Sequence, residues 1–243
     1  MGKTLLARCI GSHSYFGGLF NLDQFEEDAD YAVFDDLAGG MDDLKIFYKD
    51  INIDTDKLSS YLQSLYETMK IVFRVSEDDT FLESNSLSTI KWREYNVFQF
   101  NNVQIYDLLV AVRQLAGEVF DHYGIDPSQE RYMIQGWFNI NYNTSGKLDW
   151  HRHVSDDQDT SKMFHGYYGV RTDNSSTFYK TDSGILENKN KSNRLILANS
   201  KYPHAMGDWD WDGPRISIAY DLLPLSVVLE QDLDHQHWVP LIY

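Results

Sequence analysis

The chain has 243 residues, 42% of them hydrophobic, which is enough for one large domain or for a domain with an extension. Its formal net charge of −16 argues against a surface that neutralises many phosphates, so we expect duplex nucleic acid not to be a partner. The single cysteine, Cys9, allows no internal disulfide, and the absence of a long apolar run or a signal-peptide pattern predicts a cytoplasmic protein without membrane spans.

The first forty residues differ in character from the rest of the chain. Gly-Lys-Thr at positions 2–4 precedes an apolar stretch, and YAVFDDL predicts a short strand that ends in Asp35 and Asp36. In a P-loop ATPase, a Lys-Thr pair contacts phosphate and Mg²⁺, and acids at a strand end hold the metal. A bare Gly-Lys-Thr is common by chance, so the motif needs the surrounding sequence to support it.

The surrounding sequence resembles a known viral family. GKTLLARCIGSHSYFGGLF and DADYAVFDDLAGG are similar to the helicase part of replication-initiator proteins from small circular single-stranded DNA viruses. The resemblance implies nucleotide-binding roles for Lys3, Thr4, Asp35 and Asp36. The first loop glycine and the sensor segments of that family are missing. We therefore interpret residues 1–40 as a replication-initiator-like ATPase fragment and expect it to be a non-functional extension.

A second domain is expected over residues 41–243, and its first part is helical support for a later sheet. Residues 45–53 predict a strand, and a polar loop is expected over 76–89. Asp54 or Thr55 can cap a helix with apolar residues at helical spacing. These residues are Leu58, Leu62, Leu65, Met69 and Val72. A second helix is predicted from about Val103 to His122 and is ended by Gly124, so the helical part spans about 54–124.

After Pro127 the sequence becomes a series of short strands separated by turn residues. The strands are YMIQGWFNINYN, FHGYYGVR, STFYKT, NRLILAN and PRISIAYDLL. Short strands at this spacing predict a mainly β domain with flanking helices (α+β), with a double-stranded β-helix, or jelly roll, as its core over about 130–225. The segment 226–243 is interpreted as a C-terminal docking tail.

His151 and His153 stand two positions apart in GKLDWHRHVSDDQD. If a strand runs through them, both side chains face the same space and can hold one metal ion. A third ligand must come from another strand, and His204, which follows the strand predicted over 193–199, is the best candidate.

Arg215 and Ser217 lie two apart on the strand that follows His204. A guanidinium and a hydroxyl on one strand face form a good clamp for a carboxylate. A metal beside such a clamp suits a ligand that chelates at one end and carries a carboxylate at the other, as 2-oxoglutarate does.

Five segments together resemble the non-haem Fe(II)- and 2-oxoglutarate-dependent oxygenases, with the closest likeness to a phage and bacterial branch with a His-x-His motif. They are NINYNTSGKLDWHRH, FHGYYGV, STFYKTD, RLILANSKYPHAMGDW and GPRISIAYDL. The resemblance is good over about 130–225 and looser over 41–130. It implies metal ligation by His151 and His204, a 2-oxoglutarate clamp of Arg215 and Ser217, and a pocket strand carrying Thr177 and Phe178.

The departure from the family pattern is at position 153. The usual triad is two histidines and one carboxylate, and the carboxylate position is occupied here by His153. Three imidazoles can still hold Fe(II). Asp149, two residues before His151, is the second choice for this ligand, and Asp156 or Asp157 could serve from the loop.

Further residues are candidates for the pocket wall, although their places in strands explain them equally well. They are Asn139, Asn141, Tyr142 and Tyr167, and we name Tyr142 and Asn139 with Thr177 as cofactor-binding candidates. His165 is expected to pack in a sheet, and His235 and His237 repeat the His-x-His spacing without a nearby clamp.

The resemblance implies a dioxygenase that uses Fe(II), 2-oxoglutarate and O₂ to hydroxylate a small molecule or a protein side chain, with release of succinate and CO₂. The location would be the host cytoplasm if the protein is of phage or viral origin. Two alternatives stay open. One is a cupin-like jelly roll that binds metal or carbohydrate, inactive or with other chemistry, and the other is a remnant of a viral P-loop protein.

Overall fold

The structure is a computed structural model, and it describes residues 13–17, 31–35, 44–72, 81–82, 86–89, 95–142, 150–153, 159–231 and 238–241. The chain divides into two compact units. One comprises Met1–Asp43 with Thr181–Gly184, and the other comprises Leu44–Lys180 with Ile185–Tyr243. A functional domain boundary near residue 40 stays a prediction.

The first unit contains a parallel pair of strands, β1 (His13–Gly17) and β2 (Tyr31–Asp35). The strand expected before Asp35 is therefore present. Lys3, Thr4 and Asp36 lie outside the described residues.

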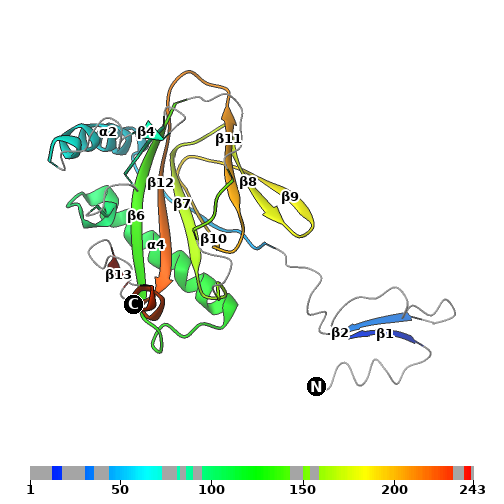
Figure 1. Cartoon of the computed structure of the whole chain (residues 1–243). Coiled ribbons are helices and arrows are strands. Elements are labelled where there is room, and N and C mark those ends of the chain that lie inside the picture. Colours follow the sequence, from blue (N-terminus) through cyan, green and yellow to red (C-terminus); the bar gives the residue numbers. More distant parts are fainter. Residues whose placement is uncertain are drawn as a thin grey trace. The chain divides into compact units, whose positions relative to one another are not determined.

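The second unit is built on two sheets (Figure 1). The larger has eight strands in the order β3-β10-β7-β12-β6-β5-β4, with β13 paired to β6, and its pairings are antiparallel. Its strands are β3 (Phe47–Asp50), β4 (Phe81–Leu82), β5 (Ser86–Ser88), β6 (Tyr132–Asn141), β7 (Phe164–Arg171), β10 (Arg194–Asn199), β12 (Arg215–Pro224) and β13 (Val239–Leu241).

The smaller sheet has three strands in the order β11-β8-β9. They are β8 (Ser175–Thr181), β9 (Gly184–Lys189) and β11 (His204–Trp209). The domain is thus mainly β with flanking helices and a jelly-roll core, as the strand pattern predicted.

Among the described residues of this unit there are two long helices and two short ones. They are α2 (Thr55–Val72), the 3₁₀ helix η3 (Val97–Gln99), α4 (Val103–Tyr123) and α5 (Leu225–Glu230). The Asp54 carboxylate accepts a hydrogen bond from the Lys57 amide at the start of α2. Asn102 caps α4, and Gly124 ends it with φ of 66°, a left-handed conformation that glycine adopts without strain. Both predicted long helices are confirmed.

One face of the large sheet packs against the helices. Because side chains alternate along a strand, every second residue of β6, β7 and β12 joins this core with the apolar stripe of α4. The contributing residues include Leu108, Val112, Leu115 and Val119 from the helix, and Ile134, Phe138, Tyr168, Ile218 and Leu222 from the sheet. The buried Tyr220 hydroxyl on this face donates a hydrogen bond to the Ile196 carbonyl oxygen at 2.7 Å.

The other face of the large sheet looks toward the smaller sheet. The Arg215 Nε on β12 donates to the Ser175 Oγ on β8 at 3.3 Å, a bond that crosses from one sheet to the other. The polar residues of the candidate site therefore lie between the two sheets, separated by the large sheet from the helix-covered core.

Several local predictions were wrong. The expected loop over 76–89 contains β4 and β5, and the strand expected over 45–53 is limited to β3. Neither β9 nor β11 was predicted. Strand β9 is almost wholly exposed, and β11 is a short edge strand whose buried face consists of Ala205, Gly207 and Trp209, so neither has a long apolar alternation.

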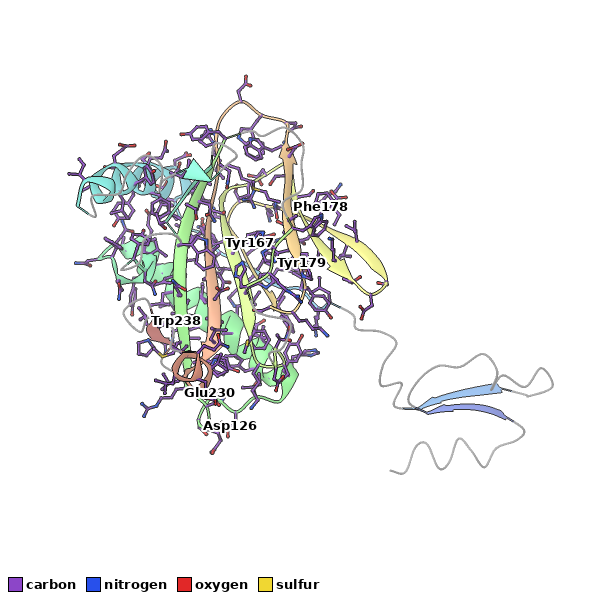
Figure 2. All side chains as sticks on the ribbon, in the orientation of Figure 1. Asp126, Tyr167, Phe178, Tyr179, Glu230 and Trp238 are labelled. Carbon is purple, nitrogen blue, oxygen red and sulfur yellow. The ribbon has the colours of Figure 1, made fainter. Side chains whose placement is uncertain are left out.

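The predicted C-terminal tail is instead part of the fold where the structure describes it. It contains α5, and β13 pairs with β6. Trp238 is buried with Met163, Leu223 and Val228 in a small core, and Figure 2 labels its side chain. His235 and His237 lie outside the described residues. Within the described part of the chain, no helix is long and apolar enough to cross a membrane.

A glycine substitution in the large sheet should be strongly destabilising. A Cβ at Gly166 on β7 would collide with the Ile196 carbonyl oxygen of the next strand and lie 2.6 Å from Tyr220 Cζ. We expect Gly166→Ala to lower the free energy of unfolding by about 3 kcal/mol. The matched control is Gly117→Ala in α4, where a Cβ meets nothing within 4 Å and helix propensity should stabilise by about 1 kcal/mol. Urea unfolding measures both, and equal effects would contradict the close packing at Gly166.

Candidate metal centre and carboxylate clamp

Three histidines converge between the sheets. His151, His153 and His204 each offer a ring nitrogen, and these atoms lie within 4.8 Å of one another. His151 is exposed, whereas His153 and His204 are half-buried, so one side of the cluster is open to solvent. Three imidazoles at this spacing are a suitable donor set for a divalent transition metal.

The main chain aligns the cluster differently from our expectation. Strand β6 ends at Asn141, so it does not run on through His151 and His153. Instead, His151 forms an isolated antiparallel bridge with His204 at the start of β11. The two residues exchange amide-to-carbonyl hydrogen bonds of 3.0 and 2.8 Å. The bridge therefore holds ligands from two separate segments side by side.

The ring geometry agrees with a shared centre. The ring centroids of His151 and His204 are 4.5 Å apart, and those of His153 and His204 are 5.1 Å apart. The rings of His151 and His153 stack at 5.5 Å. Burial, and then the neighbouring His153 and His151, holds the pKa of His204 well below its usual range. At neutral pH its ring is thus uncharged, the form that coordinates a metal.

Asp221 contacts the cluster from β12. Its Oδ1 lies 2.6 Å from the Nδ1 of His153, and both side chains are largely buried. Burial by itself lowers the pKa of His153, but the charge of Asp221 and its hydrogen bond outweigh burial and raise it. Sequence reasoning missed Asp221. The signal for it was the two-residue period of the strand, which places Asp221 on the same face as Arg215 and Ser217.

A fourth imidazole stands beside the three. His165 on β7 is buried, and its ring stacks on His204 at 4.3 Å with an interplanar angle of 9°. Neither ring nitrogen has a hydrogen-bond partner among the described residues. Burial, followed by the three nearby histidines, holds the pKa of His165 well below its usual range, so it is neutral. His165 is not part of the group of three histidines whose ring nitrogens converge. It packs in the sheet, as expected.

Arg215 is a buried cation that has no anionic partner among the described residues. Only 5% of its surface is exposed, and among the described residues no carboxylate forms an ion pair with it. Its hydrogen bonds go to two hydroxyl groups, Ser217 Oγ and Ser175 Oγ, both at 3.3 Å. Burial lowers the pKa of the guanidinium. A buried unpaired charge is costly, so this environment suits a bound anion such as a carboxylate.

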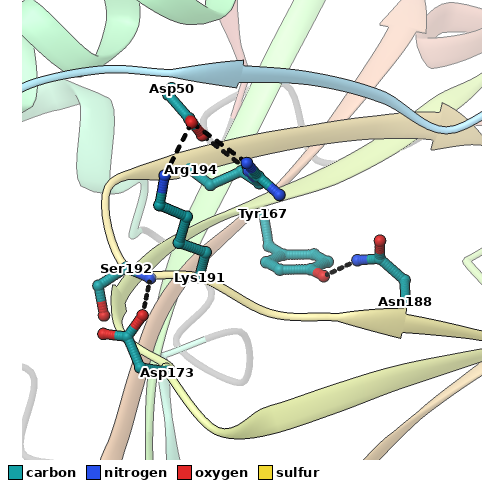
Figure 3. Close-up of polar contacts among 7 residues, drawn as sticks. All are labelled: Asp50, Tyr167, Asp173, Asn188, Lys191, Ser192 and Arg194. Carbon is teal, nitrogen blue, oxygen red and sulfur yellow. Dashed lines mark hydrogen bonds and ion pairs between the residues drawn. The ribbon is translucent and has the colours of Figure 1, made fainter.

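A network of polar side chains forms the wall beside Arg215. The Tyr167 hydroxyl donates to Asn190 Oδ1 at 2.5 Å and accepts from Asn188 Nδ2 at 3.0 Å, the second of which Figure 3 draws. Thr177 also donates to Asn190 Oδ1, at 3.1 Å, and Asn190 Nδ2 donates to Ser175. The Arg215 guanidinium carbon lies 6.0 Å from the centre of the Tyr167 ring. These bonds hold the wall in a single arrangement around the cation.

The interior face of β12 carries both the clamp and Asp221, the acid that contacts the metal cluster, at different positions along the strand. Ser217 and Asp221 are four residues apart on β12, which corresponds to about 13 Å of strand. Between them stands Ala219, whose Cα partner on β7 is Tyr167.

The remaining predicted site residues differ in how deeply they are buried and in which way they face. Asn139 on β6 is the Cα partner of Ser217 and is half-buried, whereas Tyr142 follows the end of β6 and is 44% exposed. Phe178 lies between the inward-facing Thr177 and Tyr179 and packs near Gly207. Figure 2 labels Tyr167, Phe178 and Tyr179 on the strands that bound the site. Asp149, Asp156 and Asp157 lie outside the described residues.

Comparison with known proteins gives distant structural matches. No model of a known protein family matches the chain. No curated protein matches it. Among solved structures, a prolyl-4-hydroxylase from Pseudomonas putida is 11% identical with a TM-score of 0.48, and the match covers 75% of this chain and 94% of that one. HygX from Streptomyces hygroscopicus, with nickel and 2-oxoglutarate bound, is 10% identical with a TM-score of 0.47, covering 76% of this chain and 85% of that one.

A nickel complex of the non-haem monooxygenase ThoJ is 14% identical with a TM-score of 0.32, and the match covers 39% of this chain. The chain spans 45% of the length of ThoJ in that match. Because these similarities are distant, we base the proposed function on the geometry of the site.

Proposed function

We propose that the protein is a non-haem oxygenase that uses Fe(II), 2-oxoglutarate and O₂ to oxidise a substrate. The observation that carries the proposal is a buried Arg215 without a carboxylate partner among the described residues, on the interior face that also reaches the three-histidine cluster. A cosubstrate with a carboxylate at each end would supply the anion that this cation lacks, which a metal ion alone would not.

The donor set fits Fe(II). His151, His153 and His204 would hold the ion from one side and leave its other positions for the cosubstrate and oxygen. When bound, Fe(II) and 2-oxoglutarate supply oxidative decarboxylation to succinate and CO₂, coupled to oxidation of a C–H bond. We assign the third ligand to His153 because it lies within the cluster, and Asp149 remains the alternative.

The chain itself positions the cosubstrate. Arg215 would hold its far carboxylate by a bidentate contact, with Ser217 as a further donor. Thr177 and Tyr167 would line the clamp, held in place by their hydrogen bonds to Asn190. Asn139 would lie beside Ser217, its pairing partner on the neighbouring strand. Burial of these groups excludes water from the clamp and strengthens the attraction between its charges.

The open side of the cluster would give a substrate access to the metal centre. His151 is exposed, so a small molecule or a protein side chain can approach the centre there. We propose hydroxylation as the reaction and a phage-type or bacterial oxygenase as the kind of protein. Residues 41–243 would form the oxygenase domain, and residues 1–40 a replication-initiator-like fragment without ATPase activity.

The test measures binding of 2-oxoglutarate by anaerobic calorimetry, with and without Fe(II), followed by succinate release after oxygen is admitted. We expect metal-dependent binding of 2-oxoglutarate and succinate formation that requires both Fe(II) and O₂. Metal binding without any effect of 2-oxoglutarate would contradict the proposal and favour a metal-binding jelly roll of different chemistry. Absence of metal binding would exclude both.

A further inference from the structure

We infer that Asp221 is a positioning residue that orients His153 toward the metal. Through its hydrogen bond to His153, Asp221 also supplies the negative charge that a site of three histidines lacks. The inference rests on the proposed function and extends it to a residue with no assigned role. It concerns how this chain compensates for the histidine at position 153.

The contact determines which nitrogen of His153 faces the metal. A carboxylate can only accept a hydrogen bond, so the 2.6 Å contact between Asp221 Oδ1 and His153 Nδ1 places the proton on Nδ1. The lone pair then lies on Nε2, the nitrogen left to coordinate. The side chains are 15% and 13% exposed, so water competes little for the bond. Without Asp221, the ring could rotate and the proton could move to Nε2.

The acid is dedicated to His153. Among the described residues, Asp221 forms an ion pair with no lysine or arginine, and its Cα partners on β6 and β7 are Gln135 and His165. It is also the one acid on the interior face of β12, after Arg215, Ser217 and Ala219.

The charges of the site explain why an acid is needed here. Two histidines and a carboxylate reduce the charge of a divalent ion from +2 to +1, whereas three neutral imidazoles leave it at +2. A carboxylate hydrogen-bonded to a ligating histidine orients the ring and makes the nitrogen a stronger donor, and its loss costs about 10–100-fold in metal affinity. Asp221 would thus restore the net charge without entering the coordination sphere.

The test compares Asp221→Asn with the wild type by competitive titration of Co(II), without 2-oxoglutarate. The substitution keeps the size of the side chain and removes its charge. We expect Co(II) affinity to fall about 10–100-fold and the visible Co(II) spectrum to change, while the circular dichroism stays that of the wild type. Asp208→Asn is the matched control, because it removes an exposed acid from β11 and the same unit of charge. It should leave affinity and spectrum unaltered.

A double-mutant cycle separates positioning from a structural effect. If Asp221 acts through His153, then Asp221→Asn should not weaken Co(II) binding in a His153→Asp background, which keeps a third ligand at this position but removes the imidazole that Asp221 holds. Wild-type affinity and spectrum in Asp221→Asn would overturn the inference, as would equal losses in both backgrounds. Because only Co(II) binding is measured, these outcomes are independent of succinate formation, whose absence would count against the proposed function alone.

Discussion

A His204→Ala variant is expected to lose metal binding and, with it, all metal-dependent succinate formation. His204 connects the cluster, because its ring lies near both His151 and His153 and its backbone forms the bridge to His151. The alanine keeps the two backbone hydrogen bonds and removes only the imidazole. Changes to groups that merely support a ligand cost about 10–100-fold in affinity, so loss of a ligand should cost more than about 100-fold. Co(II) or Fe(II) titration under anaerobic conditions measures the loss.

The control is His122→Ala in α4. His122 is an exposed histidine whose ring nitrogen lies 3.1 Å from Lys45 Nζ, away from the cluster. Metal affinity should be that of the wild type in this variant. Retained metal binding in His204→Ala would show that the metal binds outside the cluster and would remove the basis of the proposed function.

Substitution of Arg215 should have a large effect on 2-oxoglutarate and none on the metal. We expect Arg215→Leu to weaken 2-oxoglutarate binding about 100-fold or more, because loss of a buried charge partner costs about 2–5 kcal/mol and 1.4 kcal/mol is tenfold. Co(II) affinity should stay unchanged, since among the described residues Arg215 bonds only to Ser175 and Ser217. The same titrations measure both ligands.

The stability of the unliganded variant provides an independent readout. A buried guanidinium without a carboxylate destabilises the fold, so Arg215→Leu should unfold at the same temperature as the wild type or a higher one. Arg131→Leu, which removes an exposed arginine just before β6, is the charge-matched control for 2-oxoglutarate affinity. A strong loss of stability in Arg215→Leu, with 2-oxoglutarate affinity unaltered, would identify Arg215 as a structural residue.

Local pattern was sufficient for the longer elements. The helical spacing of apolar residues after Asp54 and Asn102, and the stop at Gly124, located α2 and α4 because caps and periodicity are local properties. Alternation located β6, β7, β8, β10 and β12, since each of these strands has a face buried in the core or between the sheets. The exposed strand β9 and the short edge strand β11 have no such strong signature.

The site was predictable in part. The spacing of His151, His153, His204, Arg215 and Ser217 named the groups that the structure brings to the space between the sheets. The expected reason for the alignment of His151 and His153 was wrong, because no continuous strand carries them. A bridge between segments some fifty residues apart depends on how the two sheets face each other, which no local pattern records.

By itself, therefore, the sequence determined the α+β class, the two long helices and the identity of the histidines and of the arginine that could form a site. Only the tertiary structure decided that Asp221 lies against His153, that His165 stacks on His204, and that Arg215 is buried without a carboxylate among the described residues. The physical reason is that helix caps and strand periods act over a few residues. Partners of a buried charge are set by the register between strands far apart in the chain.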